Sequence, residues 1–144
     1  MVKLLASLVV LCLISITYAR SGTLINREQI KYIKTQQFIQ WFKNNHIVLL
    51  YFYSPNCEYC TITDPYIEEL KNAGIKVYRI NINNHYKATS KWHIMGTPTT
   101  IAVDPIHHIA VPYQGFFNSI KLLLFYFYNQ LIKIEKKRDL DNNT

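Results

Sequence analysis

The sequence predicts an α/β fold in which a central mixed β-sheet is flanked by helices. The apolar run 47–53 is too continuous for a half-exposed strand, so it indicates a central strand buried on both faces. A helix, a second strand at 76–82 and a short helix follow it. The segments 99–103 and 108–111 are typical of two antiparallel strands joined around Asp104-Pro105. Strand-helix units followed by a hairpin therefore predict a mixed sheet.

The sequence also predicts four helices. Asn26 can cap the first, with Gln29 reaching back to it. Pro65 lies inside the second helix, and because proline lacks an N–H and clashes with the preceding turn, we expect a kink near Asp64. The predicted helical segments are 26–44, 57–74, 86–92 and a last one from 118 or 119 to 138.

The first nineteen residues are typical of a cleavable signal peptide. Lys3 precedes an apolar stretch from Leu4 to Ile16, and Thr17-Tyr18-Ala19 forms a small-residue cleavage site. The stretch is shorter than the ~20 apolar residues of a membrane-spanning helix, which favours cleavage over an uncleaved anchor. Cys12 lies inside the stretch, so a lipoprotein signal is the weaker alternative. We therefore expect export, with no stable membrane span after cleavage.

The rest of the chain is predicted to be one domain at 20–138, followed by a polar C-terminal tail at 139–144. With 144 residues and 49% apolar content, the protein can build one core, and no linker or repeat marks a second domain. The formal net charge of +7 is spread along the chain, and the dense basic cluster at 133–138 fits a solvated helix end. No nucleic-acid partner is expected.

Cys57 and Cys60 lie where the first strand passes into the second helix. A thiol in the first turn of a helix is close to unpaired N–H groups and to the positive end of the helix dipole, and both favour the thiolate. The first thiolate can attack a substrate disulfide, and a second thiol three residues later can resolve the mixed disulfide. After signal cleavage these are the only cysteines, so they pair with each other or with a partner.

Half of a zinc site has the same Cys-x-x-Cys spacing, so a zinc-binding protein is one alternative. The other ligands would have to come from the histidines at 46, 85, 93, 107 and 108. None of them forms a His-x(3–5)-His pair after Cys60, and no second Cys-x-x-Cys exists. We therefore predict no metal and no organic cofactor.

Gly96-Thr97-Pro98-Thr99 precedes and opens the third strand. A cis Thr97-Pro98 bond would turn the Thr97 backbone toward a neighbouring loop, where it can pair with an extended substrate. An ordinary trans proline at the start of a strand is the alternative on these residues alone.

The combined pattern resembles the thioredoxin superfamily over nearly the whole chain after the signal. The resemblance rests on the apolar strand leading into Cys57-Glu58-Tyr59-Cys60, on Pro65, on Gly96-Thr97-Pro98-Thr99 and on Gly115 before the last helix. It implies a thioredoxin-like fold, with Cys57 as the exposed nucleophile and Cys60 as the buried resolving thiol. It also implies that Pro65 kinks the helix and that Pro98 is a cis-proline packed against a Cys57–Cys60 disulfide.

The chain departs from the cytoplasmic thioredoxin pattern at several positions. Asn56 replaces a tryptophan, and Glu58-Tyr59 replaces Gly-Pro. Tyr51 stands where the family has a buried acid, and Arg79 stands where it has a lysine, so proton removal from Cys60 is left to water, Arg79 or a substrate group. With its signal peptide, the chain looks more like thioredoxin-like proteins of the bacterial periplasm. We expect a periplasmic location ahead of an extracellular or lumenal one.

Glu58 and Tyr59 are expected to set the direction of electron flow and the choice of partner. Glu58 places a negative charge beside Cys57 and works against the helix dipole, so we expect a reductant or isomerase rather than a strong oxidant. Screening of this charge by solvent is the alternative. Tyr59, Thr97 and Pro98 are expected to bind the substrate.

The sequence thus predicts an exported thiol-disulfide oxidoreductase that acts on protein substrates and exchanges electrons with an unidentified redox partner. The alternative from another class is a non-catalytic thioredoxin-fold binding module of an envelope or secretion assembly. In that case the Cys57–Cys60 disulfide would be structural.

Overall fold

A computed structural model describes the backbone of residues 27–143 and the side chains from residue 34 to residue 143. The described residues from Tyr32 onward belong to one compact unit, which the following paragraphs concern. The predicted signal peptide at 1–19 lies outside the described residues and stays a prediction. No helix in the described part of the chain is long and apolar enough to cross a membrane.

Helices and strands follow one another in the predicted order. The last helix extends further than predicted, through residues 139–142 of the expected polar tail, because no glycine or proline interrupts the chain after Gly115. The elements are α2 (Arg27–Asn44), β1 (Val48–Tyr53), α3 (Glu58–Asn72), β2 (Lys76–Asn81), α4 (Tyr86–Lys91), β3 (Thr99–Asp104), β4 (Ile109–Gln114) and α5 (Ile120–Asn142).

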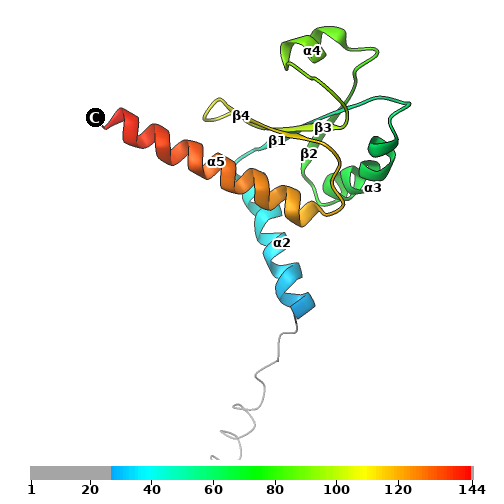
Figure 1. The fold of residues 1–144 in the computed structure, drawn as a ribbon. Coiled ribbons are helices and arrows are strands. Elements are labelled where there is room, and N and C mark those ends of the chain that lie inside the picture. The colour runs from blue at the N-terminus through cyan, green and yellow to red at the C-terminus, as the bar shows by residue number, and fades with distance from the viewer. Residues whose placement is uncertain (1–26, 144) are drawn as a thin grey trace, which may run out of the picture. The chain divides into compact units, whose positions relative to one another are not determined.

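The four strands form one mixed sheet in the order β2-β1-β3-β4, which confirms the predicted fold class. β1 is an inner strand, parallel to β2 and antiparallel to β3, and β4 pairs with β3 as the second strand of the hairpin. In Figure 1, α3 and α5 lie on one side of the sheet and α4 lies on the other. The carboxyl end of β1 meets the start of β3, where Phe52 pairs with Thr99.

The main core lies between the sheet and its helices. Alternate residues of a strand point to opposite faces, and in β1 Leu49 and Tyr51 join the main core while Phe52 is buried outside it. Each fully buried large apolar side chain contributes about 1.5–3 kcal/mol of transfer free energy. The fully buried leucine, isoleucine and phenylalanine partners from α2, α3 and α5 are Phe42, Ile67, Leu70, Leu123, Leu124, Phe127 and Leu131. This packing fixes α3, and therefore the cysteine motif, against the sheet.

Candidate active site

The two cysteines lie at the start of α3, directly after the turn that follows β1. Cys57 is the N-cap residue, with extended backbone dihedrals (φ −100°, ψ 107°), and its Sγ accepts the backbone N–H of Cys60 at 3.1 Å. A disulfide joins Cys57 and Cys60, whose Cα atoms are 5.2 Å apart. Cys57 is partly exposed and Cys60 is 3% exposed. A substrate can therefore reach the first sulfur more readily than the second.

The Thr97-Pro98 peptide bond is cis, as the family resemblance implies. Pro98 is buried and directly precedes Thr99, which pairs with Phe52 near the end of β1. The carbonyl oxygen of Pro98 accepts the backbone N–H of Gly115 at 2.9 Å. The sheet therefore brings the proline segment and the turn after β4 to the end of β1 from which the cysteine turn departs.

Tyr59, between the cysteines, is 55% exposed and stacks on Phe116, which is 45% exposed. The ring centroids are 5.3 Å apart and the planes differ by 11°. Phe116 follows Gly115, whose φ of +107° lies in the region that glycine adopts most easily. Sequence reasoning missed Phe116, although its place beside Gly115 was the available signal. The pair forms an exposed aromatic surface that joins the first turn of α3 to the turn after β4.

Arg79 lies on β2 and contacts two acidic side chains of α3. Its guanidinium Nη2 is 3.1 Å from both carboxylate oxygens of Asp64, and Nη1 is 3.5 Å from Glu68. The same guanidinium lies over the rings of Tyr53 and Tyr51, with its Cζ 4.8 Å and 5.5 Å from their centroids. Arg79 therefore joins the sheet to α3.

Asp64 is the carboxylate that sequence reasoning did not place in this network. It lies one turn after Cys60 on α3, and its Oδ1 accepts a hydrogen bond from the hydroxyl of Tyr51 at 3.0 Å. The same hydroxyl is 3.4 Å from the backbone carbonyl oxygen of Cys60. Tyr51 occupies the strand position at which the family has a buried acid. In this chain a carboxylate from α3 contacts that tyrosine.

Burial and charge act together on Tyr51 and Arg79. Burial raises the pKa of Tyr51, and the nearby Asp64 carboxylate raises it further, so the phenol stays protonated and donates. Burial of Arg79 opposes its charge, but its hydrogen bond and charge contact with Asp64 outweigh burial and raise the pKa of Arg79. The network is thus a protonated phenol, a carboxylate and a guanidinium cation. Glu58, in contrast, is an exposed residue in the first turn of α3.

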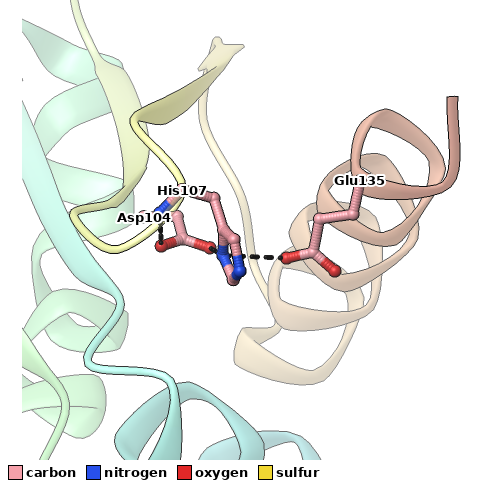
Figure 2. A group of neighbouring side chains, drawn as sticks. All are labelled: Asp104, His107 and Glu135. Atoms are coloured by element: carbon pink, nitrogen blue, oxygen red, sulfur yellow. Dashed lines mark hydrogen bonds and ion pairs between the residues drawn. The ribbon is translucent and has the colours of Figure 1, made fainter. Parts of the chain in front are cut away.

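The potential metal ligands that the fold brings together do not include the cysteines. Across the described residues, the group of three or more such side chains consists of Asp104, His107 and Glu135. Figure 2 shows them at the connection between β3 and β4 and on α5. Cys57 and Cys60 are joined to each other in a disulfide, and this group of the described residues contains neither of them.

The comparisons with known proteins agree with this fold. A family model described as "Thioredoxin" matches residues 29–122. The chain is 40% identical over 62 residues to "Thioredoxin 2" of Plasmodium berghei and 29% identical over 96 residues to "Protein disulfide isomerase-like 1-4" of Arabidopsis thaliana. The matches cover 41% and 63% of this chain but 40% and 16% of those two proteins, so the chain spans less than half the length of each relative.

Among solved structures, thioredoxin 1 from Thermosipho africanus superposes with a TM-score of 0.49. It is 20% identical, and the match covers 61% of this chain and 98% of that one.

Proposed function

Because this chain belongs to the thioredoxin family, we propose that it is a thiol-disulfide oxidoreductase that acts on protein substrates through Cys57 and Cys60. The observation that carries the proposal is the pairing of a partly exposed sulfur at the N-cap of α3 with a buried sulfur three residues later. An accessible first thiol and a shielded second thiol suit attack on a substrate followed by intramolecular resolution.

In the reducing direction the Cys57 thiolate attacks one sulfur of a substrate disulfide. That S–S bond breaks, a disulfide between Cys57 and the substrate forms, and the other substrate sulfur leaves as a thiolate that takes up a proton. The Cys60 thiolate then attacks Cys57 Sγ and releases the second substrate thiolate. Two electrons have passed to the substrate, and the protein holds its Cys57–Cys60 disulfide. A dithiol redox partner returns the electrons.

The substrate segment is proposed to lie between the Thr97-Pro98 backbone and the aromatic pair Tyr59–Phe116. Thr97 is partly exposed just before β3, where its backbone polar groups can pair with an extended chain. The stacked rings of Tyr59 and Phe116 give exposed apolar contact area at the first turn of α3, the helix that Cys57 caps. This placement favours an extended substrate segment with an apolar side chain near its cysteine.

The direction of electron flow is proposed to be reduction or isomerisation. Glu58 lies in the first turn of α3, next to Cys57, where a negative charge opposes formation of the thiolate. A less stable thiolate makes the disulfide form a weaker oxidant.

The location is proposed to be outside the cytoplasm, with a periplasmic location favoured, on the basis of the signal-like segment at 1–19. N-terminal sequencing of the protein recovered from the exported fraction tests this. A first residue of Arg20 agrees with cleavage after Ala19, whereas retention of Met1 in the cytoplasmic fraction contradicts the proposal.

Reduction of insulin by dithiothreitol, followed by turbidity, tests the exchange activity. We expect the protein to accelerate precipitation and Cys57→Ser to abolish the acceleration. A folded protein with intact Cys57 and no activity in this assay or in refolding of scrambled ribonuclease would favour the binding module instead.

A trapping experiment identifies the substrates. Cys60→Ser removes the resolving thiol, so the mixed disulfides on Cys57 should accumulate, and Cys57→Ser is the matched control. Recovery of the same proteins with both variants would contradict the assignment of Cys57 as the nucleophile.

A further inference from the structure

A second cluster of ionisable side chains lies where the end of β3 and the β3–β4 connection meet α5, outside the cysteine site. Asp104, the last residue of β3, is fully buried, and its Oδ1 accepts the backbone N–H groups of Ile106 at 2.9 Å and His107 at 3.0 Å. These two hydrogen bonds fix the orientation of the carboxylate. Its second oxygen, Oδ2, therefore points in a defined direction, toward the ring of His107.

Two carboxylates from distant parts of the chain converge on one ring nitrogen of His107. Nδ1 is 2.7 Å from Oδ2 of Asp104 and 3.4 Å from Oε1 of Glu135, which comes from α5 (Figure 2). One nitrogen carries one proton, and a proton makes one short hydrogen bond. With a proton at Nδ1, His107 makes its short hydrogen bond to Asp104, and the Glu135 carboxylate is left at a long distance from that nitrogen.

We propose that Asp104, His107 and Glu135 bind one divalent transition-metal ion of the zinc type. The ligand atoms of the three side chains lie within 4.8 Å of one another. Zinc binds imidazole nitrogen and carboxylate oxygen at about 2.0–2.2 Å, so tetrahedral ligand atoms are about 3.3–3.5 Å apart. The contact between His107 and Glu135 already has this spacing, and the contact between His107 and Asp104 must widen by about 0.7 Å to accept the ion.

The surroundings of the three ligands also suit a cation. Two carboxylates balance a charge of +2, and neutral imidazole selects a transition metal over magnesium or calcium. The backbone hydrogen bonds to Asp104 act as the outer support that holds a metal ligand in place. His107 and Glu135 are partly exposed, so an ion can arrive from solvent and keep a water ligand.

Arg138 is a positively charged neighbour that disfavours binding of a metal cation. Its Nη1 donates to the backbone carbonyl of His107 in a short hydrogen bond of 2.6 Å, so the guanidinium is held close to the cluster. The expected affinity is therefore moderate. Binding would connect the β3–β4 turn to α5, and because the folded protein alone assembles these ligands, the ion should raise thermal stability.

The test is titration of the oxidised protein with Zn²⁺ alone, followed by calorimetry and thermal unfolding. The Cys12→Ser background with the Cys57–Cys60 disulfide intact leaves no thiol to bind zinc. We expect one Zn²⁺ per chain, a higher Tm that EDTA reverses, and no displacement by a large excess of Mg²⁺. X-ray absorption should show nitrogen and oxygen ligands.

Matched variants separate this site from adventitious binding. We expect His107→Gln to abolish uptake and Glu135→Gln to weaken it by at least about tenfold, a loss in the range seen when groups around metal ligands are removed. His108→Asn is the control, because His108 is exposed on the same turn with φ of 55°, which asparagine tolerates. Absence of saturable zinc binding, or uptake that survives in folded His107→Gln and Glu135→Gln alike, would overturn the proposal.

Discussion

The hydroxyl of Tyr51 donates a hydrogen bond to Oδ1 of Asp64 across 3.0 Å, and this contact ties the centre of the sheet to the helix that carries the cysteines. Tyr51 is fully buried, whereas the Asp64 side chain is 39% exposed. A buried hydroxyl needs a hydrogen-bond partner, because loss of that partner leaves the desolvation cost of the hydroxyl uncompensated. Asp64 therefore stabilises the fold by accepting a hydrogen bond from a buried residue, although its own side chain is partly exposed.

Asp64→Ala should lower the free energy of unfolding by about 1–3 kcal/mol, because it removes the main partner of the Tyr51 hydroxyl. Asp64→Asn keeps an acceptor oxygen and loses a partly exposed ion pair with Arg79. We therefore expect it to lower the free energy of unfolding by about 1 kcal/mol or less. Urea denaturation of the oxidised protein measures both. Glu68→Gln, half exposed on the same helix, is the control, and an equal effect of Asp64→Ala and Glu68→Gln would contradict the argument.

Phe116→Ala should reduce kcat/KM for protein disulfide reduction several-fold by removing the stacked partner of Tyr59. Both rings are about half exposed. The free energy of unfolding should therefore fall only by the amount typical of an aromatic pair, about 0.5–1.5 kcal/mol. Insulin reduction at several substrate concentrations and urea denaturation give the two values. Leu122→Ala, an exposed residue on α5, serves as comparison, and an unchanged kcat/KM in Phe116→Ala would remove Phe116 from the substrate surface.

Glu58→Gln should make the couple more oxidising by between about 5 and 20 mV. A charge at a helix N-terminus changes stability by about 0.3–1 kcal/mol, and for a two-electron couple about 30 mV corresponds to 1.4 kcal/mol. Equilibration with glutathione gives the potential. Glu69→Gln is an exposed control further along α3, and equal potentials for both variants would show that solvent screens Glu58.

The ion pair between Asp104 and His107 gives a defined pH dependence in EDTA. The hydrogen bond between His107 and Asp104 raises the pKa of His107 above the ordinary 6.5, although burial opposes this rise. Burial works against the Asp104 carboxylate, but the hydrogen bonds from His107 and Ile106 outweigh it and hold the pKa of Asp104 below 3.8.

The raised His107 pKa stabilises the fold fully below pH 6.5, and this contribution is lost as the pH rises through the folded value. The lowered Asp104 pKa stabilises it fully above pH 3.8, and this contribution is lost as the pH falls through the folded value. Urea unfolding in EDTA at mildly acidic and alkaline pH should show the decline on the alkaline side. His107→Gln should reduce that decline and His108→Asn should not; equal declines in both would contradict the assignment.

Two phenylalanines of α5 should differ sharply in their effect on stability. Phe127 is fully buried and Phe125 is 51% exposed. Phe127→Ala should cost about 3–5 kcal/mol, because it opens a cavity in the core, whereas Phe125→Ala should cost about 1 kcal/mol, mainly its contact with Phe38. Urea denaturation of both variants checks the difference, and similar midpoints would mean that α5 packs through another face.

The local features of this protein could be predicted from its sequence. The apolar run before Cys57 predicts an inner strand, and that strand ends where the cysteine helix begins. These patterns involve residues that are neighbours along the chain, and periodicity and turn chemistry record such neighbours well. The cis bond at Pro98 was predicted through the family resemblance, since the residues alone left a trans bond open.

The sequence by itself determined the fold class, the order of the elements and the position of the two cysteines, because each depends on short-range patterns. Only the tertiary structure decided which side chains meet: Asp64 with Tyr51 and Arg79, Phe116 with Tyr59, and Glu135 with His107. Each of these pairs joins different elements, and their contact depends on the strand register and on how each helix packs on the sheet. No spacing in the chain records that geometry, because it arises from the packing of the whole core.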